Sequence, residues 1–246
     1  MFFFFSCTCD IEKTVNRFFK RLNLMKITDE IYQVGGNGFS SPEDAAIYLI
    51  VFGKHAAFVD AGCGRSLDKV INNIKVCGIS PRQIDYLLIT HCHFDHTGGA
   101  EAIKDEFQCQ IIAHKLDAKY LEQGNDTVTA ANWYGSSLKP FYVDRKLTGS
   151  REIIHLGGKN IEAIHAPGHS PGSVVYLTES AGKKVLFAQD VHGPLDSSFM
   201  SNKKDYLKSL KLLVSLEADI LCEGHFGIYE GKNEVARFIE SFLMGS

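Results

Sequence analysis

The sequence contains no run of about 20 apolar residues, the length that a membrane-spanning helix requires. An excess of positive charge is also missing, because 26 Lys and Arg stand against 29 Asp and Glu and the net charge is −3. A surface that binds nucleic acid is normally basic, so this balance argues against a nucleic-acid partner and leaves a small-molecule substrate as the expected partner. The composition does not decide the oligomeric state, and a homodimer stays open.

Cysteine pairs at regular spacing are absent as well. The seven cysteines are an odd number without paired spacing, which argues against a disulfide framework. Unpaired thiols are typical of a reducing compartment, and we therefore expect a cytoplasmic protein. The chain also lacks an internal linker rich in Pro or Ser, and its 246 residues and 27.3 kDa suit one large domain.

The first 24 residues differ from the rest of the chain. The phenylalanine-rich start, Met1–Phe5, is too short for the apolar core of a secretory signal. Residues 12–24 have a basic, weakly amphipathic pattern that is typical of a loosely attached terminal helix or of a helix that touches a membrane surface. We predict an N-terminal extension over residues 1–24 and a single domain over residues 25–246, and we leave open whether the extension belongs to the mature protein.

Apolar runs and helical spacings alternate over most of the chain, which predicts a mixed α/β fold. The runs rich in β-forming residues cover 46–52, 56–59, 84–89, 111–113, 152–156, 161–165, 173–178, 184–188 and 219–222. Helical spacing is present over 67–76 (with Ser66 as the expected N-cap), 100–107, 116–121, 204–216 and 234–243.

One six-residue stretch, His91-Cys92-His93-Phe94-Asp95-His96, follows the apolar run 84–89. Three imidazoles and a carboxylate are too many ligands for one zinc ion held by this loop alone. A solvated polar loop would account for one or two of these histidines but not for the cluster. His91 and His93 are two residues apart and can point to one side, whereas Asp95 and His96 follow a turn and point elsewhere. The stretch therefore predicts two incomplete metal sites that need ligands from later in the chain.

Three later residues lie where such ligands are needed. His169, Asp190 and His225 each stand at the end of an apolar run with Gly or Pro nearby, where a strand delivers a side chain to the rim of a sheet. The first predicted ligand set is His91, His93 and His169. The second is Asp95, His96 and His225, with Asp190 between the two sets.

The spacing His-x-His-x-Asp-His, followed by a His, an Asp and a His at these intervals, resembles the metallo-β-lactamase superfamily. Asp60, in Ala-Ala-Phe-Val-Asp-Ala-Gly, matches an earlier motif of that family, and the resemblance covers about residues 28–244. It implies a four-layer αββα sandwich with the site between its halves. It also implies that Asp60 is a buried carboxylate that supports the ligands without binding metal. The carboxylate at Asp190 favours the glyoxalase II-like and lactonase-like branch over class B1 β-lactamases, which have a cysteine there.

The resemblance implies a metal-dependent hydrolase. We expect two zinc ions per chain, with iron or manganese as alternatives, and a shared hydroxide that cleaves an ester, thioester or lactone bond of a small molecule. Asp95 and Asp190 are the expected catalytic carboxylates, and Asp190 would bridge the ions. The alternative is an oxidoreductase similar to the persulfide dioxygenases, which bind one iron at positions matching the first histidine set, with Asp190 also involved.

Two parts of the chain are expected to contact the substrate. His192 follows Asp190 by two residues and can face the cavity from a rim loop. Residues 124–147 are rich in Asn, Gly, Ser and aromatic residues, a composition that favours a lid with Trp133 and Tyr134 as contacts. The alternative is that these aromatic side chains pack back onto the core.

Overall fold

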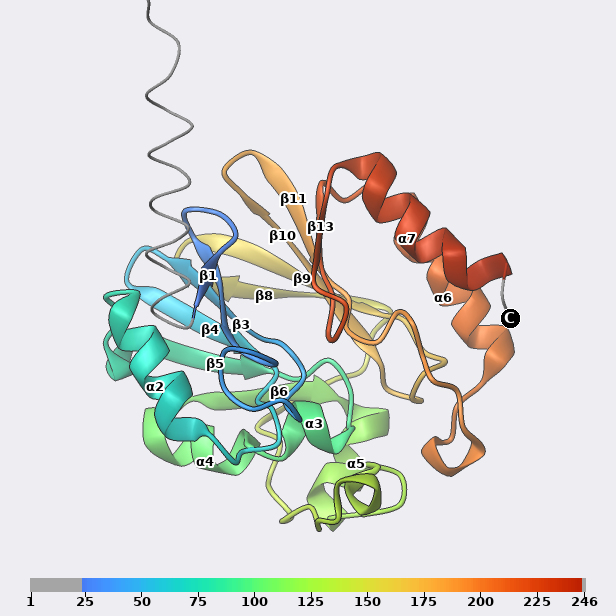
Figure 1. Ribbon diagram of the computed structural model, residues 1–246, viewed down its shortest axis with the longest axis horizontal. Helices are drawn as coiled ribbons and strands as arrows, with labels where there is room; N and C mark the ends of the chain where they lie inside the picture. The colour runs from blue at the N-terminus through green and yellow to red at the C-terminus, as the bar shows by residue number, and fades with distance from the viewer. Residues whose placement is uncertain (1–23, 245–246) are drawn as a thin grey trace, which may run out of the picture.

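The computed structural model describes residues 24–244, whose strands form two sheets (Figure 1). The first sheet has the strand order β1-β2-β3-β4-β5-β6-β7, and the second has the order β13-β12-β11-β10-β9-β8. The strands of the first sheet are β1 Met25–Lys26, β2 Ile31–Gly35, β3 Ile47–Phe52, β4 His55–Val59, β5 Ile84–Leu88, β6 Gln110–His114 and β7 Arg145–Leu147. Those of the second are β8 Arg151–Leu156, β9 Lys159–His165, β10 Val174–Ser180, β11 Lys183–Phe187, β12 Ile220–Cys222 and β13 Ile228–Glu230.

Helices cover the outer face of each sheet. The first sheet is covered by α2 Leu67–Val76, α4 Ala100–Phe107 and α5 Lys115–Gln123, and the second by α6 Lys203–Ser215 and α7 Lys232–Met244. The remaining short helices are α3 Phe94–Thr97, η1 Pro81–Gln83, η2 Ala131–Tyr134 and η3 Ser197–Phe199. The predicted four-layer αββα sandwich is thereby confirmed.

The central strands are buried on both sides, which explains why the sequence shows apolar runs instead of alternation. In β3, Ile47 and Leu49 pack with the helices of the first layer. Tyr48 and Ile50, on the opposite face of the same strand, pack in the apolar interior that the two sheets share.

Parallel pairing brings the ends of several strands to one edge of each sheet. In the first sheet β4, β5 and β6 are parallel neighbours, and in the second β11 is parallel to β12. The carboxyl ends of parallel strands lie at the same edge, where a fold of this kind binds its ligands. The loops that follow β4, β5, β11 and β12 carry most of the polar residues named from the sequence, and His169 follows the antiparallel strand β9.

Several details differ from the sequence-based expectation. Residues 124–147 contain two elements that the sequence did not predict, η2 and the whole of β7. Strand β13 was not predicted, because it has only three residues and none of them is buried. Ser66 takes the N-cap position of α2 but its side chain makes no capping hydrogen bond.

Some expectations stay predictions. Most of the expected N-terminal extension, residues 1–23, lies outside the described residues, so the division at residue 24 stays a prediction, as does the cytoplasmic location. Within residues 24–244, none of the helices has the length and apolar character needed to cross a membrane.

A histidine stack joins the two sheets near this edge. His114 ends β6 and His165 ends β9, and their rings lie parallel with centroids 3.9 Å apart. The backbone N–H of Leu116 donates to His114 Nδ1 at 3.4 Å, which requires that nitrogen to be unprotonated. Burial, together with the neighbouring His165 and Lys115, lowers the pKa of His114 to about 4.

The buried His114 of this stack predicts that part of the folding stability is lost in acid. The folded-state pKa of His114 lies below its unfolded value of about 6.5, so the unfolded chain takes up the proton first and stability is lost as the pH falls below that value. Asn at position 114 keeps an oxygen acceptor but cannot be protonated. Between about pH 7 and about pH 5, we therefore expect the free energy of unfolding of His114→Asn to fall by about 2 kcal/mol less than that of the wild type. Denaturant unfolding of the metal-free chain measures the difference. His155→Asn, at an exposed strand position, is the control, and equal acid losses in all three proteins would contradict the prediction.

Candidate metal centre

Loops from both sheets bring seven polar side chains together between the two halves. They are His91, His93, Asp95, His96, His169, Asp190 and His225. The first four follow β5, and the others follow β9, β11 and β12 of the second sheet. Six of the seven are buried, and only His225 has a side chain that is partly exposed, at 32%. The structure thus brings together all seven residues that the sequence predicts as ligands.

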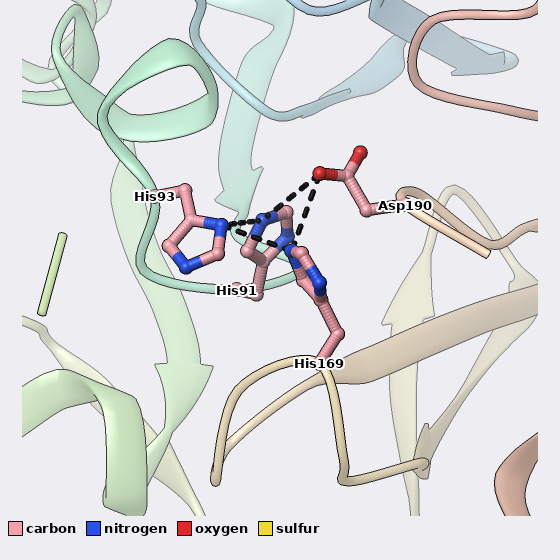
Figure 2. Close-up of side chains that lie close together, drawn as sticks. All are labelled: His91, His93, His169 and Asp190. Carbon is pink, nitrogen blue, oxygen red and sulfur yellow. Dashed lines mark hydrogen bonds and ion pairs between the residues drawn. The ribbon is translucent and has the colours of Figure 1, made fainter. Parts of the chain in front are cut away.

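The first group is formed by three histidines and one carboxylate that point toward one another (Figure 2). His93 Nδ1 lies 3.0 Å from His91 Nε2 and 2.9 Å from His169 Nε2. Asp190 Oδ2 closes the group at 3.3 Å from His169 Nε2 and 3.6 Å from His91 Nε2. Each residue thus contributes one ligand atom to a single point.

The second group uses the other oxygen of the same carboxylate. Asp190 Oδ1 lies 3.2 Å from His96 Nε2 and 3.3 Å from His225 Nε2. Asp95 Oδ2 is 3.2 Å from His225 Nε2 and 3.6 Å from His96 Nε2. Asp190 therefore lies between the two groups with one oxygen toward each.

The loop after β5 is held in place by Asp60, which is fully buried. Its carboxylate accepts hydrogen bonds from the backbone N–H of Thr90 at 2.8 Å and from the Thr90 hydroxyl at 2.7 Å. It also lies 2.7 Å from His96 Nδ1, so that Nε2 of this ring is the nitrogen turned toward the second group. Asp60 takes a backbone φ of 61°, in the left-handed region that Asp tolerates better than most residues.

The ring of His169 is also fixed through its Nδ1, which lies 2.9 Å from the carbonyl oxygen of Pro194.

Residues of these two groups fit divalent metal ions. Among the described residues, four buried side-chain atoms have no hydrogen-bond partner: His93 Nε2, His96 Nε2, Gln189 Oε1 and Asp190 Oδ1. His96 Nε2 and Asp190 Oδ1 both face the second group. Buried polar atoms are rarely left without a partner, so this is the arrangement expected around a bound cation. Imidazole nitrogens and carboxylate oxygens are ligands that zinc, iron and manganese all accept.

Protonation differs between the two groups. Burial and the neighbouring histidines lower the pKa of His93 to about 3 and that of His91 well below its usual value. Both imidazoles are therefore neutral, the form that binds a metal ion. Burial also disfavours the charged form of His225, but Asp190 and Asp95 outweigh it and raise the pKa of His225 to about 10. Asp190, Asp95 and Asp60 likewise outweigh burial and raise the pKa of His96. A cation in the second group therefore has to displace protons, whereas one in the first group does not.

Glu223 is a functional candidate that the sequence reasoning missed. It is fully buried, and its Oε2 accepts hydrogen bonds from the backbone N–H groups of His225 and Phe226 at 2.6 and 2.8 Å. Its Oε1 lies 2.8 Å from Nδ1 of His192, the residue predicted to contact substrate. The available signal was a carboxylate two residues before a predicted ligand, in Leu-Cys-Glu-Gly-His.

Aromatic side chains from the 124–147 segment lie beside the metal groups. Trp133 is 63% exposed, and its ring packs on Phe199 with centroids 4.7 Å apart. Phe199 in turn contacts the ring of His93, with ring centroids 4.5 Å apart.

Tyr134, in the same segment, has its hydroxyl next to Asp95. Burial and this carboxylate raise the pKa of Tyr134 above its usual value. Other residues of the segment, such as Phe141, are buried in the core. The segment thus serves partly as core and partly as a rim near the metal groups.

Comparison with known proteins agrees with this geometry. Residues 41–225 match the protein family described as "Metallo-beta-lactamase superfamily". The chain is 32% identical over 152 residues to a probable metallo-hydrolase, MJ0888, of Methanocaldococcus jannaschii, which covers 61% of this chain and 68% of the relative. It is 32% identical over 139 residues to the hydroxyacylglutathione hydrolase GloC of Haemophilus influenzae, over 56% of this chain and 61% of the relative.

Longer matches cover most of the chain. The acyl-coenzyme A thioesterase MBLAC2 of Gallus gallus is 27% identical over 240 residues, which is 87% of this chain and 83% of the relative. Among solved structures, the class B3 di-zinc metallo-beta-lactamase LRA-12 from an Alaskan soil metagenome superimposes with a TM-score of 0.74. It is 26% identical and covers 90% of this chain and 90% of that chain.

The two groups predict separable metal binding. We expect the metal-free wild-type chain to bind two equivalents of Zn²⁺ and His225→Ala to bind one tightly, because the first group is left intact by this change. His155→Ala, at an exposed strand position, serves as the control and should keep two equivalents. Elemental analysis after gel filtration gives the counts. A single equivalent in the wild type, or two retained in His225→Ala, would contradict the division into two groups.

Proposed function

Because this protein belongs to the metallo-beta-lactamase superfamily and is a metal-dependent hydrolase, we propose that it uses two zinc ions to cleave an ester, thioester or lactone bond of a small molecule. Within that range we favour a thioester. The observation that carries the proposal is the position of Asp190, whose two carboxylate oxygens face two separate groups of histidine and carboxylate ligands.

Two ions suit this centre better than one. The ligand atoms divide into two clusters, and each offers enough donors for one zinc ion with an open position. The structural relative LRA-12 is described as a di-zinc enzyme, which supports the same occupancy here. Iron or manganese at the same positions would require the same neutral imidazoles and carboxylates.

The chemistry divides between the metal ions and the chain. Bound zinc ions would polarise a substrate carbonyl and lower the pKa of a water molecule to about 7. The chain holds the ligands rigid: Asp60 fixes the ring of His96, and Glu223 fixes the backbone at His225. Such preorganised groups stabilise charge that develops in the reaction without having to rearrange.

The partly exposed His225 marks the side from which the substrate reaches the centre, because the other ligands are buried. His192 lies on this side with its ring 5.3 Å from that of His225. Since Glu223 engages its Nδ1, Nε2 is the nitrogen left to contact a substrate oxygen. We assign His192 to substrate binding on this geometry.

A thioester with an apolar acyl group fits the surroundings of the centre. Two of the relatives carry names that denote thioester hydrolysis, a hydroxyacylglutathione hydrolase and an acyl-coenzyme A thioesterase. Two aromatic side chains beside the centre are more than half exposed and offer apolar surface to an acyl group: Trp133 at 63% and Phe226 at 60%. Trp133 packs on Phe199, which contacts His93, and the ring of Phe226 packs on that of His192.

A hydrolysis panel on the zinc-loaded protein tests the reaction class. It should include acyl thioesters, lactones, aryl esters, phosphodiesters and β-lactams, and we expect the highest kcat/KM for an acyl thioester. Asp190→Asn should lower that kcat/KM by about 100-fold or more, because it removes a ligand shared by both ions. The exposed change Asp29→Asn, at a side chain that is 82% exposed, is the matched control.

Two results would contradict this function. One is a single iron per chain together with persulfide oxidation. The other is loss of cooperative unfolding in Asp190→Asn, which would show that the centre has mainly a structural role.

The aromatic rim predicts a second kinetic effect. Trp133→Ala should raise KM or change the ranking of acyl substrates while metal content and Tm stay unchanged, because its ring is largely exposed. Tyr142→Ala is the matched control, since this exposed aromatic of the same segment lies beside Lys104 and Lys146. A fall in stability of several kcal/mol with unchanged kinetics would instead identify Trp133 as a core residue.

A further inference from the structure

Asp117 is a buried carboxylate that belongs to neither group of candidate ligands. It lies in the first turn of α5 and is 1% exposed. Its oxygens are already engaged by the protein. Oδ2 accepts hydrogen bonds from the backbone N–H of Cys92 at 2.9 Å and from the hydroxyl of Ser170 at 2.5 Å. Oδ1 accepts one from the backbone N–H of Gly172 at 2.6 Å. Because both oxygens accept hydrogen bonds from the protein, we assign Asp117 a structural role and not that of a metal ligand.

The three donors belong to the two loops that carry the first histidine group. Cys92 lies between His91 and His93, on the loop that follows β5 of the first sheet. Ser170 and Gly172 follow His169, in the turn between β9 and β10 of the second sheet. One carboxylate thus ties together two loops that are more than 70 residues apart in the chain and come from different sheets.

The contact between Asp117 and the second loop is tight. A Cβ atom at Gly172 would lie 2.6 Å from the backbone nitrogen of Asp117 and 2.6 Å from its carboxylate, so the approach requires glycine. The Ser170 hydroxyl is itself held 2.8 Å from the hydroxyl of Ser173, and the Ser173 hydroxyl accepts from the Ser170 N–H at 3.0 Å. The loop is therefore fixed in its position relative to α5.

Helix capping does not account for this arrangement. The N-cap of α5 is His114, whose side chain accepts from the N–H of Leu116. The carboxylate of Asp117 is directed to the two loops and away from the first N–H groups of its own helix. A side chain that only completed the helix would not need donors from both sheets.

Asp60 provides a useful comparison. Its carboxylate directly contacts the ring of His96, so it supports the second group. It reaches His91 of the first group only through the Thr90 hydroxyl, which lies 3.1 Å from His91 Nδ1. We propose that Asp117 is the corresponding positioning residue of the first group, which fixes His91 and His93 against His169 and thereby sets the affinity of this group for its metal ion. The inference rests on the proposed two-metal centre, and it assigns the two ions to separate supporting carboxylates.

The test measures metal affinity and does not depend on catalysis. Metal-free wild type, Asp117→Asn and Asp60→Asn are titrated with Zn²⁺ against a chromophoric chelator. We expect Asp117→Asn to lower the affinity for one of the two Zn²⁺ equivalents by about 10- to 100-fold and to leave the affinity for the other unchanged. Asp60→Asn should weaken the equivalent that Asp117→Asn spares. The exposed Asp68→Asn, in the first turn of α2, is the matched control and should leave both equivalents unchanged.

The His225→Ala background assigns the effect to a group. With one equivalent left, Asp117→Asn should weaken its binding by the same factor. Asp60→Asn should weaken it by a smaller factor, because Asp60 reaches His91 only through the Thr90 hydroxyl. Co²⁺ absorption of the remaining site should shift in Asp117→Asn, because the histidine geometry changes. If Asp117→Asn does not fold, Ser170→Ala removes one of the three donors and should weaken the same equivalent by a smaller factor.

The outcomes separate this inference from the proposed function. A lower Tm of the metal-free Asp117→Asn with unchanged affinity of both equivalents would overturn the inference and leave the two-metal function in place. Equal weakening of both equivalents would also overturn it. A wild-type chain that binds only one equivalent would instead overturn the proposed function, whatever Asp117→Asn does in the His225→Ala background.

Discussion

The arrangement depends on one buried carboxylate, Asp190, placed between two clusters of imidazoles. A charge taken out of water is costly unless opposite charge or hydrogen-bond donors surround it. Each oxygen of Asp190 faces two histidine nitrogens at 3.2 to 3.6 Å, and Asp95 adds a second carboxylate to the cluster. This concentration of ligand atoms is tolerable when the protein binds cations there. Geometry and family membership therefore lead to the same conclusion, that of a metal-dependent hydrolase.

The αββα sandwich makes this concentration possible. Each sheet contributes the ends of its strands to the same region, so ligands far apart in the chain meet without long connecting loops. Apolar packing between the sheets, including Tyr48 and Phe187 with ring centroids 5.5 Å apart, holds the two halves in register. Buried carboxylates then determine the orientation of individual ligands: Asp60 acts on the His96 ring and Glu223 on the backbone of His225. The apolar core positions the two halves, and the polar contacts orient the side chains.

Sequence reasoning reached the seven candidate ligands because they occur in a dense local motif and at the ends of recognisable apolar runs. The same pattern predicted only a mixed α/β fold, and the layer order came from the family resemblance. Glu223 was missed although it stands two residues before a predicted ligand, because its contact with His192, 31 residues away in the chain, leaves no local pattern. Phe199 was missed for the same reason, since nothing near it in the chain indicates that its ring meets those of His93 and Trp133. Strand β13 is too short and too exposed to produce a pattern.

The central claim is that the protein holds two metal ions on opposite sides of Asp190. A crystal structure of the zinc-loaded protein with anomalous scattering recorded at the zinc absorption edge tests it most directly. We expect two anomalous peaks about 3.5 to 4 Å apart, the spacing of two-metal sites. One peak should lie among His91, His93 and His169, and the other among Asp95, His96 and His225. A single peak in fully loaded crystals, or a second peak away from Asp190, would contradict the account.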